Sequence, residues 1–183
     1  MNLDKFTQKA QDAILDAQSI ATEHNHQQIE PEHLLAALLR QADGVAPQVL
    51  QRAGVDPRAL LAEAEQKLAA RPKVYGSNAQ VGLARATADA LNAAQREAQA
   101  MRDDYTSTEH LLLALEGVAR ALSAGRAITR DALLKALTAI RGSQRVTSPT
   151  PEATFNALEK YEIGRASCRE RSVRPGVDLG GRR

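Results

Sequence analysis

The chain has very little cysteine and few aromatic residues. Its single cysteine, Cys168, lies near the C-terminus, so residues 1–161 can form neither a disulfide framework nor a thiol-based active site. Hydrophobic residues make up 43% of the chain but aromatic residues only 3%, so a core must consist of leucine, alanine, isoleucine and valine. Such a core favours closely packed helices over a β-sandwich.

Long hydrophobic runs are also missing. No segment approaches the roughly 18 apolar residues of a membrane span. Residues 1–6 read Met-Asn-Leu-Asp-Lys-Phe and begin an amphipathic helical pattern instead of the apolar stretch of a secretory signal. We therefore expect a cytoplasmic protein that does not bind membranes.

The net positive charge of the chain comes from its C-terminal residues. The formal net charge is +2, but residues 162–183 carry six arginines against three acidic residues. Residues 1–161 are therefore slightly acidic, and they offer no electrostatic attraction for nucleic acid. Nucleic acid is accordingly not an expected partner.

No motif for catalysis or metal binding stands out. The G-x-x-x-x-G-K-[ST] loop that cradles ATP phosphates is absent from the sequence, so this chain is not expected to hydrolyse ATP. Asp103 and Asp104 lie in a polar turn, which does not supply the burial that acid–base catalysis by paired carboxylates requires. His24 and His26 lie in a polar loop without a third ligand nearby. We expect no enzymatic activity, no metal and no cofactor.

The sequence does contain an internal repeat. Residues 32–35 and residues 109–112 both read Glu-His-Leu-Leu, 77 positions apart, and upstream alanines recur at the same offset. Downstream the offset falls to 73, where residues 55–61 align with residues 128–134. One four-residue deletion thus aligns two halves of about 70 residues each, which indicates an internal duplication.

Each half has the apolar periodicity of four helices. This predicts an all-α fold of about eight helices in two pseudo-symmetric repeats, about 1–70 and 81–142, with a turn-rich linker at 71–80. The helices are expected at 4–24, from 31 to Gly44, at 46–53, from 57 to about 70, at 81–102, from about 107, at 118–123 and, as the last, up to Gly142.

The composition changes after Gly142. Residues 143–161 form a connector, and its first ten residues contain two prolines with several serines and threonines, which predicts a flexible linker. Residues 153–161 have the composition to begin another helix. Residues 162–183 contain four glycines and almost no apolar periodicity, so we expect disorder there.

The two repeats, the paired Glu-His-Leu-Leu motifs and the opening Met-Asn-Leu-Asp-Lys-Phe-Thr resemble the N-terminal domain of Clp-type AAA+ unfoldases. Within that family the sequence is most similar to ClpB disaggregases, and the similarity extends through Ala-Leu-Glu-Lys-Tyr at 157–161. The resemblance implies a Clp domain over 1–142 that recognises unfolded or aggregated polypeptide for a chaperone. The alternative is a domain that docks adaptor proteins, as in ClpA or ClpC. The family assembles through its ATPase modules, so we expect a monomer.

The tail departs from this family. There the connector leads into an ATPase module, whereas Tyr161 is followed by the basic run at 162–183. The run looks like vector-derived or frameshifted sequence joined to a truncated gene. A genuine short, basic tail is the other interpretation.

The resemblance also implies substrate-binding residues. Thr7, Asp103 and Glu109 match polar residues with which ClpB proteins handle substrate. Each has a structural alternative: Thr7 can cap the first helix, Asp103 can cap or turn the loop before the sixth helix, and Glu109 can form a capping box with Thr106.

Leu91 and the two repeated histidines have competing roles too. Leu91 is a candidate for lining a groove between the repeats, but it aligns with Ile14 and is equally a core residue. His33 and His110 lie in first helical turns, so we expect them to bond the neighbouring loops.

Function is expected where the two copies differ. Asp103 and Asp104 precede the second motif, where the first copy has His26 and Gln27. Glu109 is common to both motifs, so its functional role depends on these acidic neighbours.

Overall fold

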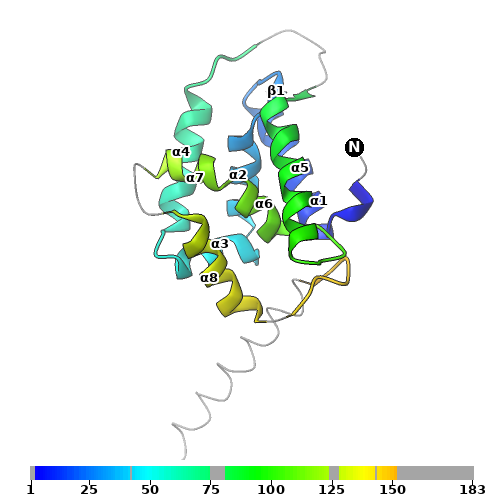
Figure 1. The fold of residues 1–183 in the computed structure, drawn as a ribbon. Helices are drawn as coiled ribbons and strands as arrows, with labels where there is room; N and C mark the ends of the chain where they lie inside the picture. Colours follow the sequence, from blue (N-terminus) through cyan, green and yellow to red (C-terminus); the bar gives the residue numbers. More distant parts are fainter. Residues whose placement is uncertain (1–2, 42, 75–80, 124–127, 143, 152–183) are drawn as a thin grey trace, which may run out of the picture.

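The computed structural model describes residues 3–41, 43–74, 81–123, 128–142 and 144–151. Within these ranges it contains eight α-helices, four in each repeat, and the predicted all-α fold is confirmed (Figure 1). The predictions for the tail at 162–183, for a helix at 153–161 and for linker residues 75–80 concern residues outside these ranges.

Repeat one begins with a short 3₁₀ turn and continues with four helices. The elements are η1 (Leu3–Lys5), α1 (Gln8–Glu23), α2 (Pro31–Arg40), α3 (Val45–Arg52) and α4 (Pro57–Ala69). Thr7 caps α1, since its hydroxyl accepts a hydrogen bond from the Ala10 N–H at 3.4 Å. Asp56 caps α4, and Pro57 at the first helical position sacrifices no intrahelical bond.

Repeat two contains four helices in the same arrangement. Its helices are α5 (Arg85–Ala100), α6 (Thr108–Ala114), α7 (Glu116–Leu122) and α8 (Arg130–Arg141). The predicted cap Thr129 accepts a hydrogen bond from the Ala132 N–H at 3.3 Å. Gly142 ends α8 with φ of 62°, a conformation that favours glycine.

The two repeats interlock. Within each repeat the first two helices pack together, as α1 on α2 and α5 on α6, while α1 also contacts α6 and α5 contacts α2. The short helices cross over: α3 lies against α6 and α8, and α7 lies against α2 and α4 (Figure 1). Each of these contacts has its counterpart in the other repeat, as a pseudo-twofold relation requires.

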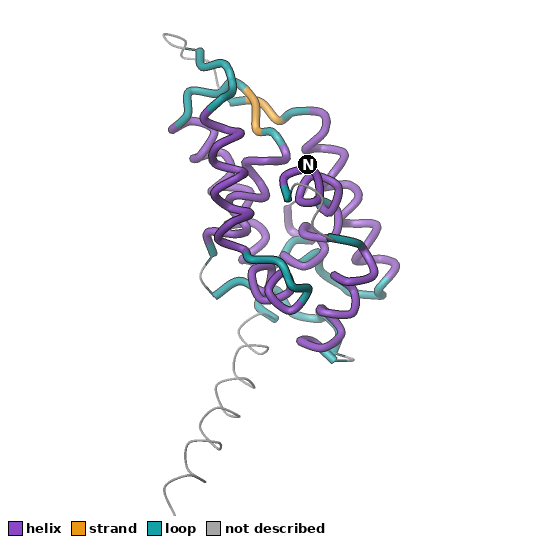
Figure 2. Tube along the Cα trace, turned by 90° about the vertical axis from the view of Figure 1, so that its left-hand side faces the viewer, coloured by secondary structure: helices purple, strands orange, loops and turns teal. Residues whose placement is uncertain are grey.

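Two short parallel pairings also join the repeats, and the sequence did not predict them. β1 (Gln28–Ile29) pairs with β2 (Gly82–Leu83), and Phe6 forms an isolated bridge with Thr106. Figure 2 shows the β1–β2 pair in orange at one end of the helices. The two pairings are related by the 77-residue offset. In each, residues that precede the first helix of one repeat pair with residues that precede the second helix of the other repeat. Two-residue strands show no alternation that sequence analysis can detect.

The core is aliphatic, as the composition predicts. All residues of α2 from Pro31 to Leu39 are buried, because helices of both repeats surround it. Leu91 on α5 is 1% exposed and belongs to this core. Each fully buried leucine contributes about 1.5–3 kcal/mol. None of the described helices is long and apolar enough to cross a membrane.

The described part of the connector is bound to the domain. Val146 is fully buried, and its N–H donates to the Asp103 carboxylate at 2.9 Å. The Gln8 N–H donates to the carbonyl of Pro149 at 2.9 Å. The prediction of a flexible linker is therefore wrong for residues 144–151. Hydrogen bonds of the main chain anchor this segment, and such bonds cannot be recognised from composition.

Candidate functional site

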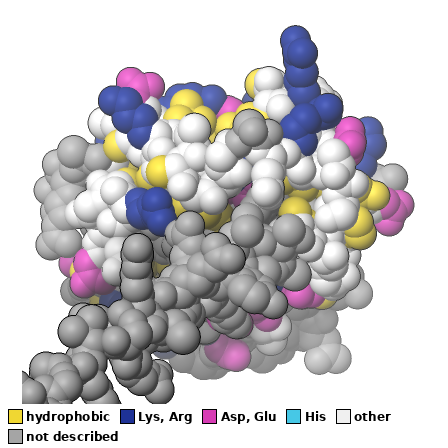
Figure 3. Space-filling view, turned by 90° about the horizontal axis from the view of Figure 1, so that it is seen from below, with side chains coloured by type: hydrophobic (Ala, Val, Ile, Leu, Met, Phe, Trp, Pro, Cys, Tyr) yellow, Lys and Arg dark blue, Asp and Glu magenta, His cyan; other side chains and the backbone are white. Residues whose placement is uncertain are grey.

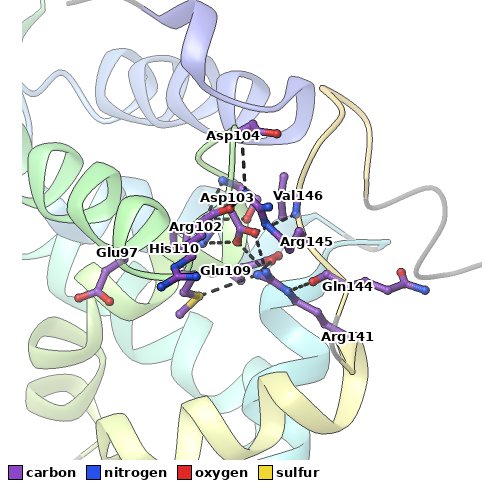
Figure 4. Close-up of polar contacts among 12 residues, drawn as sticks. Glu97, Arg102, Asp103, Asp104, Glu109, His110, Arg141, Gln144, Arg145 and Val146 are labelled. Atoms are coloured by element: carbon purple, nitrogen blue, oxygen red, sulfur yellow. Dashed lines mark hydrogen bonds and ion pairs between the residues drawn. The ribbon is translucent and has the colours of Figure 1, made fainter.

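Two of the predicted site residues meet in one buried polar cluster in repeat two (Figure 4). We call Asp103, Glu109, His110 and Arg141 the acidic cluster. Nη2 of Arg141 lies 2.7 Å from the Asp103 carboxylate, and Nη1 lies 3.0 Å from Oε1 of Glu109. The Asp103 and Glu109 side chains are 0% and 1% exposed, so a single guanidinium is paired with two buried carboxylates.

Three helix ends bring the cluster together. Arg102 adopts φ of 57° after α5, and the Asp103 N–H then bonds back to the carbonyl of Ala98 at 2.9 Å, which turns Asp103 inward. Glu109 lies in the first turn of α6, and Arg141 is the last residue of α8. The cluster thus joins segments up to 38 residues apart.

Asp103 also binds the connector. Its Oδ1 accepts hydrogen bonds from Arg141 and from the Val146 N–H, while the Asp104 N–H donates to the Val146 carbonyl at 2.9 Å. Burial raises the pKa of Asp103, but hydrogen bonds from His110, Val146 and Arg141 outweigh it and hold the pKa below its ordinary value. The prediction that Asp103 lies in an unburied polar turn is therefore wrong.

His110, and not Glu109 as predicted, forms the capping box at the start of α6. Nδ1 of His110 accepts a hydrogen bond from the Ser107 N–H at 3.0 Å, and Nε2 lies 3.2 Å from Oδ2 of Asp103. The Thr106 N–H instead donates to the Lys5 carbonyl in the bridge between the repeats. The predicted Thr106–Glu109 capping box is wrong, whereas the predicted bond from His110 to its neighbouring loop is confirmed.

Repeat one has an equivalent but different arrangement. Arg71, which follows α4, lies 3.0 Å from Glu30 and 3.3 Å from Glu32. Lys67 lies 2.7 Å from Glu32 as well, so this carboxylate has two cationic partners. His33 bonds to the Glu30 N–H as predicted, at 2.9 Å.

The other two predicted site residues lie elsewhere. Thr7 is fully buried at the start of α1, where its N–H donates to the Thr106 carbonyl at 2.9 Å. Leu91 is a core residue of α5, which agrees with the structural alternative. Within the described residues neither belongs to the acidic cluster.

A groove of about 290 Å³ adjoins the acidic cluster. Met101, Leu134 and Leu137 provide its apolar walls, and the other lining residues are Thr138, Arg141 and Gly142. In Figure 3, which shows the molecule from below, the uncovered surface has hydrophobic atoms in separate patches and no single apolar face. Sequence analysis missed this groove and Arg141, although an arginine near the end of the fourth helix occurs in both repeats.

Asp103, Glu109 and His110 also have the donor atoms of a metal site. Their ligand atoms lie within 4.8 Å of one another. Arg141, however, is bonded to both carboxylates and already supplies the positive charge. A cation would have to displace this guanidinium, so the arrangement fits an internal ion-pair network better than a metal site.

The fold and this arrangement define a helical domain of two interlocked repeats, and comparison with known proteins gives its family. The model of the Clp repeat (R) N-terminal domain matches residues 5–127. The chain belongs to this family, which confirms the predicted resemblance.

Relatives in this family carry chaperone names. The chain is 45% identical over 167 residues to the chaperone protein ClpB of Bacillus cereus, an alignment that covers 88% of this chain and 19% of that protein. The chain thus spans about a fifth of the length of this relative.

Solved structures share the fold. The Hsp104 N-terminal domain from Candida albicans has a TM-score of 0.72 at 22% identity, over 81% of this chain and 99% of that chain. A ClpV N-domain in complex with a VipB peptide has a TM-score of 0.56 at 19% identity, over 74% of this chain and 86% of that one.

Proposed function

We propose that this chain is the substrate-recognition domain of an ATP-dependent disaggregase and binds unfolded or aggregated polypeptide. The observation that carries the proposal is the groove between the end of α5 and α8, where three apolar side chains lie beside the Arg141 guanidinium. Unfolded polypeptide exposes apolar side chains next to main-chain carbonyls, which are the groups that such a groove accepts. Membership of the Clp repeat family and the similarity to ClpB support it.

The predicted site residues act from beneath the surface in this proposal. Asp103 and Glu109 hold Arg141 at the rim of the groove, and their own side chains are buried. Thr7 fixes the start of α1 against Thr106, next to the loop that carries Asp103. Leu91 supports α5 from the core. A rigid supporting layer of this kind sets the geometry of a binding surface without touching the ligand.

Binding in this groove is weak and tolerant of sequence. A volume of about 290 Å³ holds only a few side chains, so contact with any one segment is short-lived. Linkage to an ATPase ring converts such weak contacts into a high local concentration of substrate. The docked connector makes Asp103 part of that link, because the same carboxylate holds the groove and residue 146.

Adaptor docking is the second candidate function. The ClpV N-domain bound to a VipB peptide shows that a domain of this fold binds a defined partner segment. A folded adaptor would bury a larger surface than the groove, on the order of 800 Å² on each partner.

A matched pair of variants tests the proposal. Leu134 lines the groove, and Leu61 is its counterpart in repeat one at the 73-residue offset. Both side chains are half-buried. In amide NMR titrations with an unfolded model protein, Leu134→Ser is expected to weaken binding about fivefold, and Leu61→Ser to leave it unchanged.

In the unsubstituted chain, unfolded protein is expected to change the amide chemical shifts around Met101 and Thr138. Equal binding by the two variants, or shifts confined to repeat one, would remove the groove as the site. Tight binding of a folded adaptor, with no response to unfolded protein, would favour the second function.

A further inference from the structure

Repeat one contains a buried histidine pair that the proposed function does not use. His26 is 6% exposed and His33 is fully buried. Nδ1 of His26 lies 2.8 Å from Nε2 of His33, and the rings meet edge to face. Nδ1 of His33 is engaged as well, because it accepts the hydrogen bond from the Glu30 N–H at 2.9 Å.

These bonds fix the position of each proton. A main-chain N–H can only donate, so Nδ1 of His33 carries no proton and the neutral ring is protonated at Nε2. That N–H donates to Nδ1 of His26, so His26 in turn is protonated at Nε2. Burial lowers the pKa of His33 to about 4 and also lowers that of His26, which keeps both rings neutral near pH 7.

The series of hydrogen bonds that runs from Glu30 through His33 to His26 therefore ends in the N–H donor at Nε2 of His26. Among the residues that the structure describes, Nε2 of His26 has no hydrogen-bond partner, and neither does Nε of Arg71, although both atoms are buried. A buried donor without an acceptor costs about 1–3 kcal/mol. Both residues line a cavity of about 380 Å³, and the remaining lining residues are Gln27, Gln28, Glu30, Pro72 and Val74.

The surroundings favour a negatively charged acceptor. Burial is the largest cause of the lowered pKa of His26, and the nearby charges of His24, Arg71 and Lys73 lower it further, whereas Glu30, which also lines the cavity, raises it. In repeat two the position of His26 belongs to Asp103, an acceptor, and the chain itself supplies the Val146 N–H there. Repeat one has the inverse polarity, with a donor beside an open cavity.

We propose that this cavity binds a carboxylate, from a peptide C-terminus or from an acidic side chain. The carboxylate accepts hydrogen bonds from Nε2 of His26 and from Arg71. The site goes beyond the proposed function, because it lies near β1, at the opposite end of the molecule from α8 and the groove (Figure 1).

Imidazole NMR of the ¹⁵N-labelled chain tests this site. Three probes are titrated: N-acetyl-Gly-Ala-Ala with a free C-terminus, N-acetyl-Gly-Glu-Gly-amide, and N-acetyl-Gly-Ala-Ala-amide as the neutral control. His26 is expected to be protonated at Nε2 before titration. Either carboxylate probe is expected to shift that N–H and the Gln27 and Gln28 amides saturably, with Kd on the order of 1 mM. The tighter of the two identifies the natural source of the carboxylate.

Variants separate this site from the groove. His26→Phe keeps a flat ring without a donor and is expected to weaken carboxylate binding at least tenfold. Leu134→Ser is expected to leave it unchanged while weakening polypeptide binding. Protonation of His26 at Nδ1, an equal response to the neutral probe, or no saturable shift from either carboxylate would overturn the proposal. These three results come from the unsubstituted chain and do not depend on whether His26→Phe folds.

Discussion

The two repeats have the same backbone plan but opposite polar chemistry at one position. Residue 26 in repeat one and residue 103 in repeat two both follow a left-handed residue, Asn25 with φ of 58° and Arg102 with φ of 57°. Both main-chain N–H groups bond back to the preceding helix, to Ala21 and Ala98. The backbone therefore delivers the side chain inward in both cases, and the residue type decides what it binds.

Histidine and aspartate lead to different outcomes at this position. Asp103 accepts hydrogen bonds and so gathers Arg141 and the connector, which closes repeat two around a buried ion-pair network. Nδ1 of His26 accepts a hydrogen bond from His33, and the N–H at Nε2 of His26 faces a cavity. The duplicated backbone thus places residues 26 and 103 in equivalent positions. The difference between histidine and aspartate decides whether the side chain there offers a hydrogen-bond donor or an acceptor.

The largest test of this comparison removes the arginine from each repeat. Arg141 is 9% exposed and is bonded to both Asp103 and Glu109, whereas Arg71 is 32% exposed. Without Arg141 two buried carboxylates face each other uncompensated, so Arg141→Met is expected to cost about 3–5 kcal/mol of unfolding free energy in urea denaturation.

Arg71→Met is the matched variant and is expected to cost no more than about 1 kcal/mol. Lys67 remains 2.7 Å from Glu32 and continues to neutralise it. Equal losses for the two variants would show that the networks are energetically alike and would break the comparison.

The helices and their caps could be predicted because their signals are local. Apolar spacing located all eight helices, and Asp56, Pro57 and Thr129 marked helix starts by chemistry that acts within a few residues. Leu91 was ambiguous, since periodicity places a residue on the inner face of a helix without saying whether that face lines a groove.

The site could be predicted only in part because its partners are distant. Arg141 lies 38 residues from Asp103, and no local pattern links an arginine at one helix end to an acid in a turn. The sequence around Asp103 reads as a polar turn, and its burial depends on α8 and on residue 146 closing over it. Main-chain bonds to the connector and between the strands leave no trace in residue types.

The two repeats are also expected to lose stability in different pH ranges. The pKa of His33 is lowered from 6.5 to about 4 by burial, while an unfolded chain takes up this proton near 6.5. Between these values the unfolded state binds more protons, so stability is intact above pH 6.5 and falls as the pH is lowered to about 4. The expected loss is about 3 kcal/mol, measured as unfolding free energy against pH.

Asp103 has a different window. Its pKa lies below the ordinary value of 3.8, so its contribution is intact above that value and is lost only as the pH falls further. His33→Asn is expected to flatten the curve between pH 6.5 and 4 and to leave the lower limb in place. A curve for His33→Asn that retains the upper limb would assign that limb to other groups.

The smallest expected effect compares two threonine caps. Thr7 and Thr129 accept equivalent hydrogen bonds, at 3.4 and 3.3 Å, at the starts of α1 and α8. Replacing either with alanine is expected to cost about 1 kcal/mol, measured by urea denaturation. Thr7 is also joined to Thr106 of the other repeat by its N–H, whereas Thr129 has an exposed cap.

The two alanine variants therefore distinguish a cap from a binding residue. Thr7→Ala is expected to shift the amides of Thr106 and Asp103, because the bridge between the repeats adjusts, and to weaken binding of unfolded protein slightly. Thr129→Ala is expected to do neither. If Thr7→Ala abolished binding while stability and the Thr106 amide stayed unchanged, Thr7 would contact the polypeptide directly, and its burial in the free domain would have to give way when polypeptide binds.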